Sequence, residues 1–166
     1  MKRTIAVASL VTLAGLAQAH PHFAKTVTAV LPGDVTVTIT YNTTPANELR
    51  AQQTPVGQFV TPRGPRLKIS ADLKDGEKVV LAAGEYVIGV IKNSETDWVL
   101  ALYNGTLARG AQPDPAKVIK LDSMFESKLG AAEHMLVDVT PGHARFQGKA
   151  VLTLHFGSLF LQGLLV

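Results

Sequence analysis

The stretch 35–41 alternates strictly between large apolar and small polar side chains, and this period of two most constrains the fold. Val35, Val37, Ile39 and Tyr41 fall on one side of the pattern, and threonines fill the gaps. Because successive side chains of a strand point to opposite faces, the pattern predicts a strand with one buried face. Similar runs bounded by glycine turns predict strands at 67–73, 78–81, 85–92, 98–103, 117–121, 134–139, 150–156 and 159–166.

Helical patterns are scarce in this chain. One short helix is predicted at 45–52, with Thr44 as its cap, and a second at 122–132, with Asp122 as its cap and Gly130 near its end. About nine short strands with a turn roughly every ten residues are typical of sandwiches and barrels. We therefore predict an all-β fold, an antiparallel β-sandwich of the jelly-roll or immunoglobulin-like kind, with one or two short helices.

The first residues have the pattern of a secretory signal. A cationic start at Lys2 and Arg3 precedes an uncharged run over 4–17, and Ala17-Gln18-Ala19 is a small-x-small cleavage pattern. We expect a signal peptide at 1–19 and a single β-sandwich domain at 20–166, exported to the periplasm or secreted. The apolar run is shorter than the ~20 residues of a spanning helix, and the rest of the sequence has no other apolar run of spanning length, so no membrane span is expected after cleavage.

Composition excludes several classes of function. The chain has no cysteine, which excludes thiolate metal sites, iron–sulfur clusters and cysteine nucleophiles. The formal charge of +3 falls to +1 without Lys2 and Arg3, and no basic cluster suits a nucleic acid, so none is expected as a partner. Neither a Gly-x-Ser-x-Gly elbow, a phosphate-binding glycine loop nor a His-Glu-x-x-His zinc motif occurs.

Two consecutive segments resemble a known bacterial family. The run 81–91, with Ala83-Gly84-Glu85-Tyr86 at its centre, and the run 97–104, beginning Asp97-Trp98, are similar to the turn and paired strands of domain of unknown function 2911. Tyr41 and Pro45 fall where that family has a Tyr-x-x-Pro segment. The resemblance covers most of the chain after residue 19 and implies a secreted β-sandwich in bacteria. It implies no particular activity.

The histidines near the predicted cleavage site suggest a metal. As the first residue of the cleaved chain, His20 would bind a metal through its ring Nδ1 and its α-amine, a group whose pKa in unstructured peptides is about 8. A second histidine would complete a three-nitrogen site that suits copper. This arrangement resembles the histidine brace of copper-dependent polysaccharide monooxygenases and periplasmic copper carriers. We take His143, in a Pro-Gly-His turn, as the first choice for the second ligand.

His22 is a further candidate ligand, because a third-residue histidine often binds copper together with the α-amine and two backbone amides. Pro21 has no amide hydrogen to lose, so that square of nitrogens cannot close and the brace is favoured. His134 is the first residue of a predicted strand, and the sequence does not distinguish a metal ligand from a surface residue at this position. His155 is expected at a surface or edge, whereas Trp98 and Tyr103 have the alternation of core residues.

Three functions remain open from the sequence. The first is a non-enzymatic binding or structural module of unknown ligand, with copper at His20 as the candidate cofactor. The second is a copper-dependent oxidative enzyme that uses His20 and His143. The third is a metal-free carbohydrate- or protein-binding module in which loops such as 104–115 contact the partner.

Overall fold

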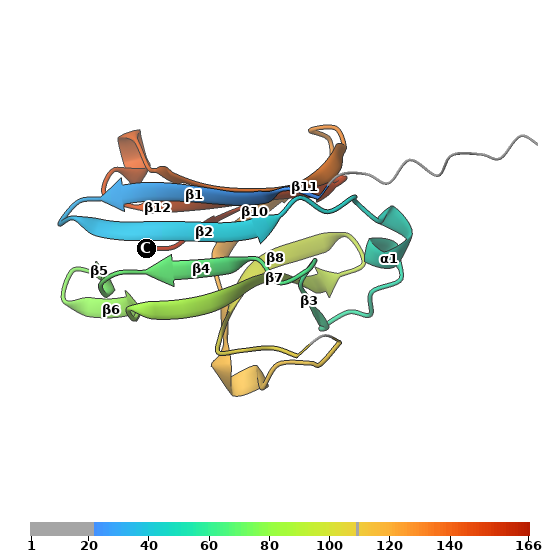
Figure 1. Cartoon of the computed structure of the whole chain (residues 1–166), viewed down its shortest axis with the longest axis horizontal. Helices are drawn as coiled ribbons and strands as arrows, with labels where there is room; N and C mark the ends of the chain where they lie inside the picture. The colour runs from blue at the N-terminus through green and yellow to red at the C-terminus, as the bar shows by residue number, and fades with distance from the viewer. Residues whose placement is uncertain (1–21, 109) are drawn as a thin grey trace, which may run out of the picture.

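The computed structural model describes residues 22–108 and 110–166, which form two facing antiparallel sheets with a single short α-helix at one end (Figure 1). The all-β, sandwich-like fold is confirmed. The elements are β1 Ala24–Leu31, β2 Val35–Asn42, α1 Glu48–Gln52, β3 Phe59–Val60, β4 Arg66–Ile69, β5 Leu73–Asp75, β6 Lys78–Leu81, β7 Gly84–Ser94, β8 Asp97–Asn104, η1 Pro115–Lys117, β9 Val118–Lys120, β10 Asp122–Glu126, β11 Ala132–Pro141, η2 Ala144–Phe146, β12 Ala150–Gly157 and β13 Leu159–Leu164.

The first sheet has seven strands in the order β1-β2-β4-β7-β8-β9, and β3 pairs with the far half of β7. The second sheet has four strands in the order β10-β13-β12-β11, and β5 and β6 form a separate hairpin. One buried cluster lies between the two sheets. Its largest fully buried members are Tyr86, Ile39, Leu67, Ile69, Leu81, Ile88, Leu100, Leu102, Met135, Leu152, Leu154 and Leu161.

Backbone pairing joins the two sheets at two corners. After β2, residues 43–46 pair with Phe23 on one side and with the start of β11 on the other, through the Met135 N–H to Thr44 O and the Ala46 N–H to Glu133 O. At the opposite corner β9 continues into β10 through Leu121, whose N–H donates to Leu100 O of β8. On one side of the sandwich the segment 43–46 thus pairs with residues of both sheets, and on the other side the chain itself changes sheets between β9 and β10.

The predicted helix at 122–132 is wrong, because its first part is strand β10. Asp122, Met124 and Glu126 are exposed, and Ser123 and Phe125 are half-buried, which is a period of two. Asp122 pairs with Leu164, and the pairing continues to Glu126 with Phe160. Hydrogen bonds to β13 thus outweigh the local helical pattern. The other predicted helix is α1, confirmed in part because it begins at Glu48.

The predicted strand at 67–73 is interrupted after Ile69. Ser70 bonds Thr36 twice, once through its backbone N–H and once as a hydroxyl acceptor, and the Asp72 carboxylate accepts the Ala83 N–H. These contacts turn the chain away from β4 into the β5–β6 hairpin. Strands β1 and β3 were not predicted. Across the described ranges no helix is both long and apolar enough to cross a membrane.

Candidate functional site

A cleft of about 750 Å³ opens where two loop regions meet the end of the sandwich near α1. One side is formed by α1 and the loops on both sides of β3, and the other by residues 107–108 and 110–112 of the loop after β8. Its volume is within the range of pockets that hold small organic ligands. The lining includes part of the loop 104–115, the loop expected to contact a partner if the protein is a metal-free binding module.

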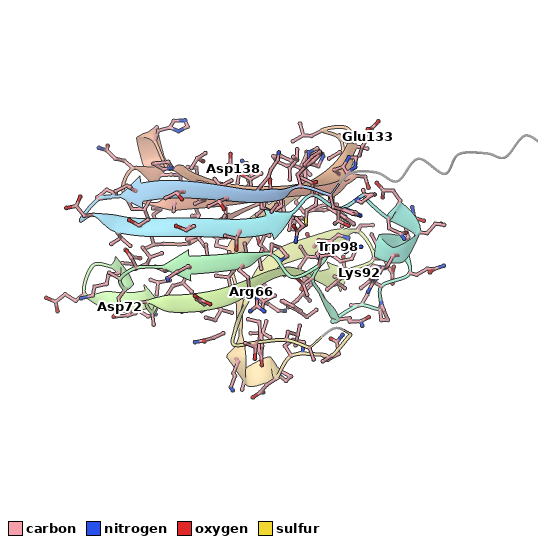
Figure 2. The ribbon with its side chains drawn as sticks, in the orientation of Figure 1. Arg66, Asp72, Lys92, Trp98, Glu133 and Asp138 are labelled. Carbon is pink, nitrogen blue, oxygen red and sulfur yellow. The ribbon has the colours of Figure 1, made fainter. Side chains whose placement is uncertain are left out.

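The floor of the cleft is apolar and comes from both sheets. Trp98 of β8 and Val90 of β7 approach it from the first sheet, and Leu154, Phe156 and Leu159 from the second. Trp98 is buried, as its alternation predicts, and Figure 2 shows it near Lys92 and α1. A ligand that reached this floor would place an apolar part against the core of the sandwich.

The wall formed by β3 depends on a glycine at position 89 of β7, because β3 packs where a larger residue would have its side chain. Phe59 pairs across from Ile91 of β7, and its ring lies over Gly89, where a Cβ atom would collide with the ring and with Val60 O. The following turn is held by the Thr61 hydroxyl, which donates to Ile88 O at 2.8 Å. Gly89 therefore lets β3 pack closely enough on β7 to form one wall of the cleft.

Of the residues that the structure describes, three arginines line the cleft, and no aspartate or glutamate does. Arg50 belongs to α1, Arg63 to the turn after β3, and Arg66 begins β4. Arg63 occupies a left-handed conformation with φ of 53°, next to Gly64 with φ of 57°. Since arginine stays protonated at any ordinary pH, the lining carries a fixed positive charge.

Arg66 is half-buried and lies on the side of the first sheet that faces the loop after β8 (Figure 2). Its Nη1 donates to Gly105 O over 3.4 Å, a long hydrogen bond. The ion pairs within residues 22–108 and 110–166 are Lys68 with Glu85 and Lys92 with Glu95, so Arg66 has no carboxylate partner there. Most of its guanidinium donors are thus available to a ligand.

A smaller pocket of about 360 Å³ lies on the other side of α1 and shares Ala51, Trp98 and Leu159 with the cleft. Here the carboxylate of Glu48 accepts hydrogen bonds from the backbone N–H and the hydroxyl of Ser158. The acidic residue of α1 is therefore bound to the turn after β12 and does not neutralise the arginines.

Lys92 holds the other end of α1. Its side chain is buried, and its Nζ donates to Gln52 O at 3.3 Å and to the Glu95 carboxylate at 2.6 Å. Asn47 caps the beginning of the helix by accepting the Arg50 N–H. Although α1 has only five residues, it is fixed at both ends, and this fixes the side of the cleft that carries Arg50.

The candidate metal ligand His22 lies at the start of β1. Its Nδ1 is 2.8 Å from Thr43 O. Because a carbonyl oxygen only accepts, Nδ1 carries the proton, and a neutral ring then has its lone pair on Nε2. A histidine that binds a metal commonly donates its other ring nitrogen to a carbonyl in this way.

The structure brings His134, and not His143, to the end of the sandwich where His22 lies. Pro45 forms a β-bridge with His134, two residues after the Thr43 that contacts His22. His143 follows the far end of β11, and at 3.3 Å per residue the stretch from 134 to 141 alone spans about 23 Å. Figure 1 shows the start of β1 and the η2 turn at opposite ends.

The remaining histidine, His155, is half-buried on the outer side of the second sheet, with its ring 5.3 Å from that of Phe160 in an edge-on contact. Among the residues placed by the structure, no three His, Cys, Asp or Glu side chains are grouped so as to hold a metal. The predicted ligand His20 and the predicted signal peptide 1–19 lie outside the described residues, so the copper hypothesis stays a prediction.

Comparison with known proteins adds no relative. No family model, no curated protein and no solved structure matches the chain. The resemblance to domain of unknown function 2911 therefore stays a prediction.

The arginines of the cleft were missed by the sequence analysis, although a signal existed. No Asp or Glu occurs from 49 to 71 or from 98 to 113, and these are the two segments that supply both sides of the cleft. A local deficit of acidic residues is a weaker signal than a motif. It is also hidden in the composition, because the overall charge of the chain is close to neutral.

Proposed function

We propose that this chain is an exported, non-enzymatic binding module that holds a small ligand in the cleft between α1, β3 and the loop after β8. The observation that carries the proposal is the cleft of about 750 Å³, whose lining combines apolar side chains with arginine, amide and hydroxyl groups. Such a combination is suited to binding and orienting an organic ligand. Export to the bacterial envelope is part of the proposal and is supported by the signal pattern at 1–19.

The test is a binding screen with Trp98 as reporter, since it is the single tryptophan of the chain and lines the cleft. We would screen mono- and oligosaccharides, organic acids and short peptides by Trp98 fluorescence and by amide chemical shifts. Ala111→Phe fills the cleft from its exposed side and is expected to abolish binding. Ala116→Phe, in an exposed position that does not line the cleft, should bind normally. Binding that ignores Ala111→Phe, or no binding in the screen, would overturn the proposal.

Copper binding is a second candidate, favoured by the orientation of His22. Its contact with Thr43 O leaves Nε2 as the ligand atom, beside the strand segment that carries His134. The test is copper(II) titration of the chain that begins at His20, compared with a chain with one alanine added before it. Tight one-to-one binding that the added alanine and His22→Ala both weaken supports a terminal site, whereas binding that ignores both changes excludes it. His143→Ala is the distant control.

A further inference from the structure

We infer that the ligand of the cleft is a small organic oxyanion, with a carboxylate or phosphate group held by Arg66 together with Arg50 and Arg63. This inference rests on the proposed function and names the chemical class of its ligand. The first ground is charge, since the described part of the lining has three guanidinium groups and no carboxylate. A neutral ligand would leave this charge uncompensated, and a cationic ligand would be repelled.

The second ground is the environment of Arg66. Arg66 is half-buried, and a charged group that is partly shielded from water is stabilised by a charged partner. Its strand neighbours are Thr40 of β2 and Val87 of β7, neither of which is charged. Glu85 is two residues along β7 from Val87, but it pairs with Lys68 at 4.0 Å. An oxyanion from outside the chain would supply the missing partner.

The third ground is the chemistry of the other cleft residues. Guanidinium groups bind planar carboxylates and phosphates with two parallel hydrogen bonds, which a lysine cannot do. The side-chain amides of Gln53, Gln58 and Gln112 line the same cleft and can bind hydroxyl or carbonyl groups of a ligand. Arg66 shares the outer face of the first sheet with Val87 and Leu107, which also line the cleft. This apolar surface suits a carbon skeleton, so an organic acid or phosphate ester fits better than a free inorganic ion.

The experiment uses the full chain, expressed with residues 1–19 in place, and matched probes that differ in charge. The first pair is trigalacturonate and the neutral galactotriose, and the second is phenyl phosphate and phenol, each titrated with Trp98 fluorescence and amide shifts as readouts. Benzoate against benzamide tests a simple carboxylate. Stronger binding of the carboxylate probes than of phenyl phosphate, or the reverse, distinguishes the two sources of oxyanion.

The expected result is that the charged member of at least one pair binds in the cleft and the neutral member binds about tenfold more weakly or not at all. Arg66→Gln should then weaken binding by about ten- to a hundredfold, the range for hydrogen bonds to a charged group. Arg66→Lys keeps the positive charge but cannot form two parallel hydrogen bonds, so its affinity should fall between those of the wild type and Arg66→Gln. Lys74→Gln, an exposed cation of the β5–β6 hairpin, should leave binding unchanged.

Two outcomes separate the inference from the proposed function. If neutral probes bind as well as charged ones, lose binding in Ala111→Phe and keep it in Arg66→Gln, the cleft is a binding site but not for oxyanions, and the inference fails alone. If no probe binds in the cleft, the inference and the proposed function both fail. Circular dichroism of Arg66→Gln and Arg66→Lys establishes that each variant is folded.

Discussion

Glu48 and Ser158 are 110 residues apart in the chain, yet both carboxylate oxygens of Glu48 accept hydrogen bonds from Ser158. The pair joins the first turn of α1 to the turn between β12 and β13 of the second sheet. It thereby fixes a helix too short to be stable by itself, because isolated helices of this length do not form in water.

Replacing Glu48 by alanine should destabilise the protein and loosen α1. Loss of hydrogen bonds to a charged group is expected to lower the free energy of unfolding by about 1.5–3 kcal/mol, measured by urea titration. Leu49→Ala is the control, because Leu49 is on the same helix with 68% of its side chain exposed, and it should change stability by less than about 0.5 kcal/mol. Equal effects of the two changes would show that the carboxylate does not anchor α1.

Replacing Gly89 by alanine should displace β3. The added methyl group would collide with the ring of Phe59, and such overpacking typically costs about 1–3 kcal/mol of stability. Adding Phe59→Leu to this variant removes the ring and should recover part of the loss, which thermal unfolding of the single and double variants measures. Additive effects of the two changes would contradict the proposed contact.

Replacing Lys92 by methionine should release the end of α1 while keeping an apolar stem in place. The variant loses the hydrogen bonds from Nζ to Gln52 O and to Glu95. We expect faster amide hydrogen exchange in α1 and a loss of about 1–2 kcal/mol in unfolding free energy. Glu95→Gln, which changes only the exposed partner of the ion pair, should have a much smaller effect. Unchanged exchange in α1 would contradict this role of Lys92.

Tyr86 should make stability depend on alkaline pH. Burial, and secondly the negative charge of Asp72, raises the pKa of its hydroxyl above the usual 10.0, while the hydroxyl donates to Ala82 O. The unfolded chain then loses this proton at a lower pH than the folded protein. The stabilising contribution is complete below about pH 10 and declines as pH rises through the folded pKa.

The measurement is the unfolding free energy of the wild type and of Tyr86→Phe from pH 8 to pH 11. We expect the wild type to lose stability more steeply above about pH 10 than the variant does. The variant should also be about 1 kcal/mol less stable at neutral pH, because it lacks the hydrogen bond to Ala82 O. Parallel curves for the two proteins would rule out a raised pKa at Tyr86.

Local periodicity predicted strands in which alternate side chains are buried over most of the length. Strand β2 shows this clearly, since Val37, Ile39 and Tyr41 all face the core. Strand β1 was missed because only its second half is regularly buried, at Ala29 and Leu31, and β3 is two residues long. The helix predicted at 122–132 failed because its partner, β13, is distant in sequence and contributes nothing to a local pattern.

The candidate site was predictable only in part. A ligand-contacting loop at 104–115 was among the hypotheses, and residues from it line the cleft. That Arg63 and Arg66 line one cleft depends on where β3 and β4 pair with β7, which no spacing in the sequence specifies. Likewise, the position of His134 near His22 follows from the bridge between Pro45 and β11, a tertiary contact.

The two corners where the sheets are joined also affect how this protein meets other chains. A free sheet edge offers unpaired backbone groups to which a foreign strand can add, and this is a common route to aggregation. Here residues 43–46 join the β1 side of one sheet to β11 of the other, and the continuous β9–β10 strand does the same on the opposite side. The backbone groups at these two corners are already paired within the chain, so strand addition is hindered there and recognition at the corners is left to side chains and loops.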